Sequence, residues 1–237
     1  MQTINFIIVL GIGLLSLDSL SSCTHTRQAV RGKKMKKNAY QKHKKTSAKT
    51  ITPDLETNPL SMNNLDVWHR LHIGTVNNYV KLVKSLLKDT KIDVNLKDVH
   101  DWTLLHYAAA EGHIGLVNLF LKDTGIQVNI EDKDGWTPLH LAVERGHIAV
   151  VQSLLEVPGI QVNKQTKDGW TPLHLAVIGR YVKVVESLLK DTKIHLNLKG
   201  MYHYTALDIA QSINCLPCVA VLEKALQKQR YKLCSIL

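Results

Sequence analysis

The sequence feature that most constrains the fold is a repeat with a period of 34 residues. The heptapeptide Asp-Gly-Trp-Thr-Pro-Leu-His occurs at 134–140 and again, unchanged, at 168–174. Leucine, histidine, valine and asparagine recur in the same register. An aromatic residue also keeps this spacing, as Trp68, Trp102, Trp136, Trp170 and Tyr204. Short units of this kind stack into an elongated array, which offers an extended surface rather than a closed pocket.

The third copy indicates two helices and a tight turn. Thr137 can cap a helix and Pro138 suits its first turn, because the first N–H groups of a helix have no partner within it. Gly146 follows where a left-handed residue commonly ends a helix. A second helix is expected at about 148–155, where apolar residues recur at helical spacing. Asp-Gly at 134–135 predicts a hairpin, since this pair tolerates positive φ.

The central motifs resemble the ankyrin repeat. They are Thr-Pro-Leu-His-Leu-Ala at 137–142 and 171–176, Gly-His at 112–113 and 146–147, and Val-Val-x-x-Leu-Leu at 150–155 and 184–189. They decide against tetratricopeptide arrays, which share a period of about 34 residues but lack the hairpin. The resemblance covers about 65–227 and implies a mainly α ankyrin-repeat solenoid. It has about five repeats, in which the first and last copies are degenerate caps.

The fourth copy departs from this pattern at the junction of its two helices. Gly179 stands one place early, and Arg180 occupies the position of the glycine. Because an arginine disfavours the left-handed conformation, the sequence predicts an altered helix–helix turn in this copy.

Four segments are expected along the chain: a lipoprotein signal peptide at 1–22, a basic disordered linker at 23–62, the ankyrin-repeat domain at 63–227 and a tail at 228–237. The apolar run at 6–15 is too short for a membrane span of about 20 residues. It is followed by Leu-Ser-Ser-Cys at 20–23, which resembles a bacterial lipobox. The resemblance implies that Cys23 is lipidated and that the protein is anchored in the cell envelope.

Two features oppose this export hypothesis. Residues 1–5 contain no Lys or Arg, although signal peptides normally begin with positive charge. The basic residues follow the apolar run instead, which favours an uncleaved anchor with the repeats in the cytoplasm. A cytoplasm-facing membrane-anchored adaptor and a secreted protein that binds another organism's proteins therefore stay open as alternatives.

The excess positive charge is confined to the linker. Ten of the 30 Lys and Arg lie between residues 27 and 49, where there is no acid, whereas 51–237 carries 20 basic and 19 acidic side chains. Such a run predicts a solvated segment. Beside a lipid anchor it would strengthen membrane binding by about 1 kcal/mol per basic residue near the surface. Nucleic-acid binding is the weaker alternative, because Tyr40 is the only aromatic residue among these lysines that could stack on bases.

The histidines and cysteines do not predict a metal or cofactor site. His72, His106, His140 and His174 occur once per copy, whereas zinc sites normally use close pairs. The family resemblance implies hydrogen bonds from these histidines to neighbouring backbone. Cys215 and Cys218 have the spacing of a redox or metal pair, but no second pair completes a four-ligand site. A local disulfide between them is left open.

No catalytic motif is present. The chain lacks a glycine-rich phosphate loop, a Gly-x-Ser-x-Gly elbow and His-Glu-x-x-His, so we expect a non-enzymatic protein. We also expect a monomer. The resemblance implies protein partners, bound by the hairpin tips and the end of each first helix on the concave side. At matching positions here, that surface comprises His100, Trp102, Glu111, Lys133, Trp136, Glu144, Arg145, Lys167, Trp170, Ile178, Tyr202 and Tyr204.

The aromatic residues of this surface, Trp102, Trp136, Trp170 and Tyr204, form what we call the aromatic column, and they are the part that we favour for binding. Trp and Tyr often dominate interface energies, at about 2 kcal/mol or more for a hot spot. The alternative is that these rings stack on their neighbours within the fold, and the sequence leaves both interpretations open.

Overall fold

A computed structural model of the protein describes residues 64–89, 92–122 and 125–234. The expected signal peptide, Cys23 and the basic linker lie outside these residues. Among the residues that the structure does describe, no helix is both long enough and apolar enough to cross a bilayer.

The described chain folds into ten α-helices and one short 3-10 helix, with no β-strand in this part of the chain. The helices are α2 (Asn64–Val76), α3 (Val80–Asp89), α4 (Leu104–Glu111), α5 (Ile114–Leu121), α6 (Pro138–Glu144), α7 (Ile148–Leu155), α8 (Pro172–Ile178), α9 (Val182–Leu188), η2 (Met201–His203), α10 (Ala206–Ser212) and α11 (Leu216–Cys234). The bounds of α6 and α7 confirm the two helices predicted for the third copy.

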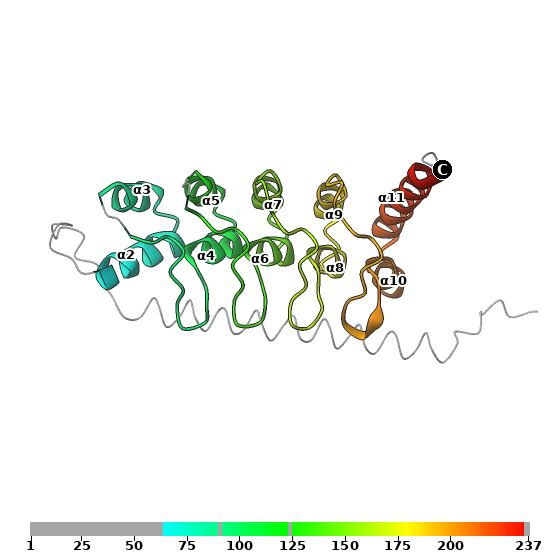
Figure 1. Ribbon diagram of the computed structural model, residues 1–237, viewed down its shortest axis with the longest axis horizontal. Helices are drawn as coiled ribbons and strands as arrows, with labels where there is room; N and C mark the ends of the chain where they lie inside the picture. The colour runs from blue at the N-terminus through cyan, green and yellow to red at the C-terminus, as the bar shows by residue number, and fades with distance from the viewer. Residues whose placement is uncertain (1–63, 90–91, 123–124, 235–237) are drawn as a thin grey trace, which may run out of the picture.

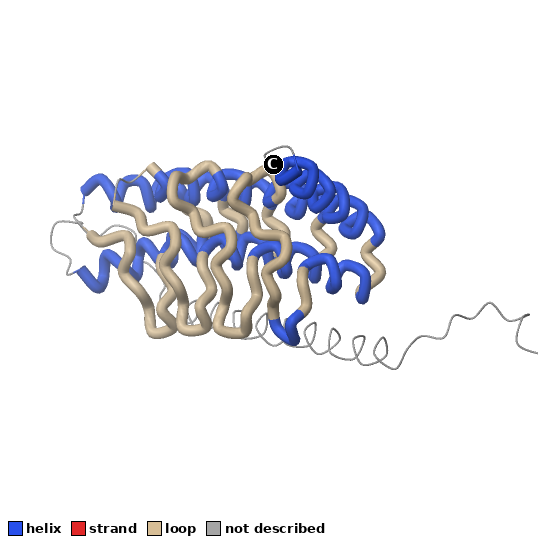
Figure 2. Tube along the Cα trace, turned by 45° about the vertical axis from the view of Figure 1, so that its right-hand side comes forward, coloured by secondary structure: helices blue, strands red, loops and turns tan. Residues whose placement is uncertain are grey.

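The helices form two rows. The first helix of each copy, α2, α4, α6, α8 or α10, packs against its equivalents in the adjacent copies, and α3, α5, α7 and α9 form the second row (Figure 1). The expected hairpins are loops that project from the first row, on the side away from the second row, and lie side by side (Figure 2). The prediction of a mainly α solenoid is confirmed.

A continuous apolar core fills the space between the two rows. The leucines of the repeat, Leu71, Leu105, Leu139 and Leu173, are all buried, together with the valines Val83, Val117, Val151 and Val185. In the last copy the equivalent Leu207 and Val219 are only partly buried, because no further unit stacks on that side among the described residues. Helix α11 of this copy continues to Cys234, past the expected domain end at Gln227.

The first helices from α4 onward begin with a threonine cap. The side chain of Thr137 accepts a hydrogen bond from the backbone N–H of His140, and Nδ1 of His140 accepts one from the N–H of Thr137 at 3.1 Å. The same reciprocal pair joins Thr171 to His174. Both backbone donors are otherwise orphans at the start of a helix, so the pair stabilises the helix end.

The helix–helix turns all contain a residue with positive φ, at one position per copy. These residues are Asn78 (59°), Gly112 (74°), Gly146 (73°), Arg180 (57°) and Asn214 (53°). The altered turn predicted for the fourth copy is therefore wrong, since Arg180 adopts the conformation that glycine has elsewhere.

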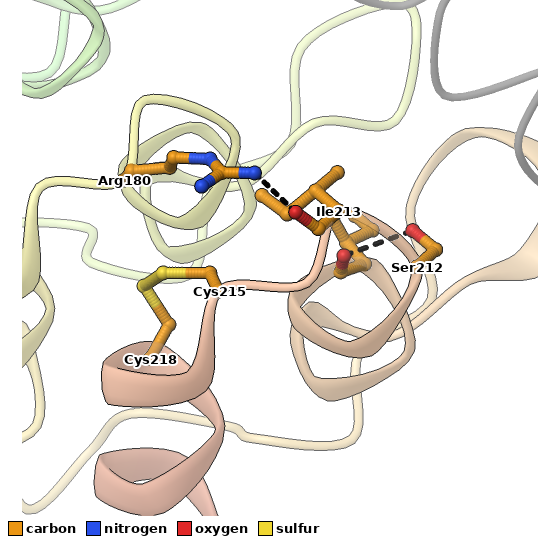
Figure 3. The surroundings of a disulfide bond; sticks show 6 residues. Arg180, Ser212, Ile213, Cys215 and Cys218 are labelled. Atoms are coloured by element: carbon orange, nitrogen blue, oxygen red, sulfur yellow. Dashed lines mark hydrogen bonds between the residues drawn. A yellow bond between two sulfur atoms is a disulfide. The ribbon is translucent and has the colours of Figure 1, made fainter.

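The hydrogen bonds of this turn are conserved in the fourth copy. The N–H of Tyr181 donates to Ala176 at 3.0 Å, as His147 does to Ala142 at 2.9 Å. A left-handed arginine is disfavoured by about 1–2 kcal/mol, and packing of the whole stack overrides that preference. The Arg180 guanidinium also donates to the backbone carbonyl of Ile213 in the next copy (Figure 3).

The projecting loops are held by turns and by their neighbours. Gly135 and Gly169 have φ values of 78° and 82°, which confirms the tight turns expected at the two Asp-Gly pairs. Asp132 closes one loop, because its Oδ1 accepts the N–H groups of Asp134 and Trp136, both at 2.8 Å. Adjacent loops are joined by the backbone, with Lys167 N–H donating to the carbonyl of Asp134 at 2.9 Å.

The recurring asparagines join each copy to the next. The side chain of Asn129 donates to the carbonyl of Gly159 at 2.9 Å and accepts from the N–H of Gln161 at 3.0 Å. Asn95 and Asn163 make the equivalent pairs of bonds in their own copies. Each amide thus satisfies two backbone groups of the following unit, which fixes the spacing of the stack.

Candidate partner-binding surface

The tips of the stacked loops present the most accessible of the predicted binding residues. Lys133 and Lys167 are exposed, His100 is half-buried, and Tyr202 on η2 is 41% exposed. We call these four residues the loop-tip surface. Because the loops are hydrogen-bonded to one another, the surface is held by a rigid scaffold, which reduces the entropy lost on binding.

The aromatic column lies mostly inside the fold. Trp136 and Trp170 are only 6% and 9% exposed, whereas Trp102 and Tyr204 are half-buried. The expectation that Trp136 and Trp170 offer large contact area is therefore not met. Trp102 is also tied to the next copy, since its Nε1 donates to Oδ2 of Asp132 at 3.1 Å. These rings support the loops from beneath.

Two of the periodic histidines, His106 and His140, contact the backbone of the next copy. Nε2 of His106 lies 3.2 Å from the carbonyl oxygen of Trp136, and Nε2 of His140 lies 3.0 Å from that of Lys164. Since Nδ1 of each ring accepts a backbone N–H, Nε2 is the donor. Burial lowers the pKa of both rings to about 4, so they are neutral at pH 7.

Metal ligands do not gather in the described part of the chain. No group of three or more His, Cys, Asp or Glu side chains is placed to hold an ion there. His106 and His140 are instead held between their own helix cap and the following unit. Nε2 of His72 and of His174 is buried without a hydrogen-bond partner among the described residues, so the bonds expected from these two rings are not found.

Three residues of the predicted binding surface lie close together at the ends of the first helices. Nη1 of Arg145 is 4.0 Å from Oε1 of Glu111, and its Nε is 3.7 Å from Oε2 of Glu144. We call these three side chains the charge cluster. Glu111 and Arg145 are largely covered and Glu144 is 6% exposed, so solvent has little access to the cluster. Ile178 of the next copy is half-buried.

A tyrosine replaces a structural histidine beside this cluster. His113 and His147 place Nε2 at 3.2 and 3.1 Å from the carbonyl oxygens of Val76 and Ala110, in the preceding copy. The equivalent residue of the fourth copy is Tyr181, whose pKa is raised by burial and then by the charge of Glu144.

The ring of Tyr181 explains why glycine occurs one place early in the fourth copy. A β-carbon on Gly179 would lie 2.3 Å from Cε2 of Tyr181, although the φ of Gly179 is an ordinary −74°. Gly179 is therefore required by packing rather than by backbone conformation. Sequence reasoning missed this contact, and the only signal was that Gly179 and Tyr181 change together relative to the other copies.

Cys215 and Cys218 form a disulfide at the start of α11 (Figure 3). Both side chains are buried, and their Cα atoms are 5.3 Å apart. The disulfide that the sequence left open is therefore part of the last copy, where it closes the first turn of the terminal helix.

The geometry of the stack agrees with the comparison to known families. A family model described as ankyrin repeats, three copies, matches residues 71–166 and 150–231. No curated protein matches the chain. Two rows of paired helices, capped by threonine and histidine and joined by projecting loops, extend through both matched segments. The chain belongs to the ankyrin-repeat family.

Proposed function

We propose that the chain is a monomeric, non-enzymatic adaptor that binds another protein through its loop tips and first-helix ends. Ankyrin repeats are, as a class, protein-interaction modules, and the partner here is unidentified. The observation that carries the proposal is the loop-tip surface, in which His100, Lys133, Lys167 and Tyr202 lie on hydrogen-bonded, stacked loops. An extended array of this kind suits a protein surface better than a small substrate.

The partner-binding residues follow from their accessibility. The loop-tip surface would make the first contacts, and Trp102, Tyr204 and Ile178 would add half-buried area. Trp136 and Trp170 would act through the loops they support.

We further propose that Cys23 is lipidated and that the basic linker holds the solenoid near a membrane of the cell envelope. Two signals, an acyl anchor and a polybasic segment, are needed for stable attachment. The Cys215–Cys218 disulfide supports the envelope side, because disulfides persist mainly in oxidising compartments. An intact mass that lacks residues 1–22 and carries acyl chains on Cys23 is the expected result.

A cytoplasm-facing anchor is the second candidate. It is favoured by the absence of basic residues in 1–5 and by the ten that follow the apolar run. A full-length, unlipidated mass with free thiols at Cys215 and Cys218 would support this topology instead.

The binding surface can be tested by charge reversal. Affinity capture from the native membrane fraction would compare the wild type with the double variant Lys133→Glu, Lys167→Glu. Lys183 and Lys190, exposed at the second-helix row, provide the matched control pair. We expect the loop pair to lose the partner and the control pair to retain it. Loss with the control pair alone would contradict the proposal.

A further inference from the structure

The stacked loops are joined by a ladder of backbone hydrogen bonds. The N–H of Lys133 donates to the carbonyl of His100 at 3.3 Å, and the N–H of Lys167 donates to that of Asp134 at 2.9 Å. The second and third loops thus each give one N–H to the loop before them. In the first loop the equivalent donor is Val99, whose N–H has no hydrogen-bond partner among the described residues.

The open donor follows from the position of the first loop. The described chain begins directly in helix α2, so none of its loops lies before the one that carries Val99. The ladder therefore starts with an unused N–H. Edges of this kind are ready templates for pairing with another chain, and proteins commonly block them with charged side chains, especially lysine.

The side chains at this edge are apolar and exposed instead. Val99 is 77% exposed, and Leu96 in the same loop is 39% exposed. The residues equivalent to Val99 in the next two loops are Lys133 and Lys167, and Leu96 corresponds to Lys164 in the third loop. Lysine is thus compatible with the fold at both positions. We call Leu96 and Val99 the loop edge.

The charged residues between these two side chains are engaged within the loops. Nζ of Lys97 donates to the carbonyl of Glu131 in the next loop at 3.0 Å. Oδ1 of Asp98 accepts the N–H groups of His100 and Trp102 in its own loop, both at 2.8 Å. Neither charge takes the place of the lysine that would block the loop edge.

The direction of the ladder defines what can bind at the loop edge. A segment that lies before the first loop has to supply a carbonyl oxygen, as His100 and Asp134 do within the stack. It also needs apolar side chains to cover Leu96 and Val99. Because side chains alternate along an extended segment, every second residue would face the edge.

We propose that the loop edge binds an extended apolar segment of the protein partner, which adds one unit to the ladder. A backbone carbonyl of the partner would accept the N–H of Val99, and its side chains would cover Val99 and Leu96. Main-chain hydrogen bonds give affinity in this mode of recognition, and alternate side chains give specificity. This inference rests on the proposed function, since it names the chemistry that the partner presents to one end of the loop row.

Peptides serve as probes for the unknown partner. Phage displaying random twelve-residue peptides are selected on the immobilised full-length protein, and labelled versions of the selected peptides are measured by fluorescence anisotropy. We expect peptides with apolar residues at alternate positions. Their affinity should fall about tenfold or more for the double variant Leu96→Lys, Val99→Lys. Leu216→Lys, Tyr231→Lys, at exposed positions of α11, is the matched control and should leave the affinity unchanged.

The loop-edge variant is designed to keep the fold. Its lysines copy residues that the third loop carries at the same two positions, Lys164 and Lys167. Its melting temperature should therefore match that of the wild type. A clearly lower melting temperature would mean that Leu96 and Val99 serve the fold, and would contradict the assignment.

Amide hydrogen exchange locates the contact. In the free protein the N–H of Val99 should exchange faster than those of Lys133 and Lys167, which are bonded within the ladder. A selected peptide at saturating concentration should slow the exchange at Val99. Slow exchange at Val99 in the free protein would mean that another part of the same chain already covers the loop edge, and would overturn the inference.

A parallel measurement separates this inference from the proposed function. The same peptides are measured with the charge-reversed pair Lys133→Glu, Lys167→Glu. If binding depends on this pair but not on Leu96 and Val99, the inference is overturned and the proposed function stands. If no selected peptide depends on either pair, both fail.

Discussion

Tyr181 packs its ring against Gly179 so closely that a β-carbon at residue 179 would lie within 2.3 Å of Cε2. In the second and third copies the corresponding pairs are Glu111 with His113 and Arg145 with His147. A large side chain is therefore tolerated at the first position when histidine occupies the second.

This relationship predicts a strong effect of Gly179→Ala. Overpacking against Tyr181 should lower the free energy of unfolding by about 1–3 kcal/mol. The double variant Gly179→Ala, Tyr181→His should recover most of the loss, because histidine at this position accommodates a β-carbon in two other copies. Urea unfolding of the three proteins measures both effects, and equal instability of the single and double variants would refute the packing explanation.

Trp136 should contribute more to the stability of the fold than to the area of the binding surface. Because it is 6% exposed, Trp136→Ala should lower the free energy of unfolding by about 3–5 kcal/mol. Tyr202→Ala serves as the comparison, since Tyr202 is 41% exposed and its loss should change stability by about 0.5 kcal/mol or less. If Trp136→Ala had the same thermal stability as the wild type, this ring would instead be assigned to the binding surface.

The buried histidines predict a stability that falls on acidification. Burial lowers the pKa of His72, His106, His140 and His174 to about 4, whereas the unfolded chain titrates near pH 6.5. Between these values the unfolded state binds protons that the folded state excludes. Stability is therefore fully present above pH 6.5 and is lost as the pH falls toward 4, by up to about 1.4 kcal/mol per pH unit for each histidine.

One substitution isolates a single histidine. His140→Gln keeps an acceptor for the N–H of Thr137, as glutamine does in a capping box, but removes the titrating ring. Melting temperatures measured from pH 7 to pH 4 should fall less steeply for this variant than for the wild type. The exposed His195→Gln is the control, and an identical slope for both variants would count against the linkage.

Reduction of the Cys215–Cys218 disulfide should loosen the C-terminal cap. Closing so short a loop stabilises the folded chain by about 2 kcal/mol in the chain-entropy description. Addition of a dithiol reductant, or the double variant Cys215→Ser, Cys218→Ser, should lower the melting temperature. Alkylation followed by mass measurement should label the two sulfurs only after reduction, and labelling without reductant would show that the bond is absent.

The periodicity of the sequence was enough to predict the helices and most of their ends. The sequence correctly predicts the roles of Thr137, Pro138 and Gly146 at the helix ends. A helix cap and a left-handed glycine depend only on residues within about one turn of the chain. The expectation for Arg180 is wrong because its side chain donates a hydrogen bond to the carbonyl of Ile213 in the next copy, and tertiary contacts of this kind override a local preference.

The candidate site was less predictable than the fold. A period identifies equivalent positions but not how far each side chain is covered, so Trp136 and Lys133 received the same role although one is buried and the other exposed. The contact of Tyr181 with Gly179 joins two residues of the same copy, but the same ring also lies against Gly146 of the preceding copy, so its position depends on how the copies stack. The spacing within one repeat does not contain this information.

Site-specific photo-crosslinking tests the central claim, that a protein partner lies on the loop tips, most directly. A benzophenone amino acid is placed at Lys133, at Tyr202 or, as the control on the opposite row of helices, at Glu186, and the protein is irradiated in its native membrane fraction. Covalent adducts of one common partner from Lys133 and Tyr202, with none from Glu186, are the predicted result. Adducts formed from Glu186 and absent from both loop positions would contradict the account.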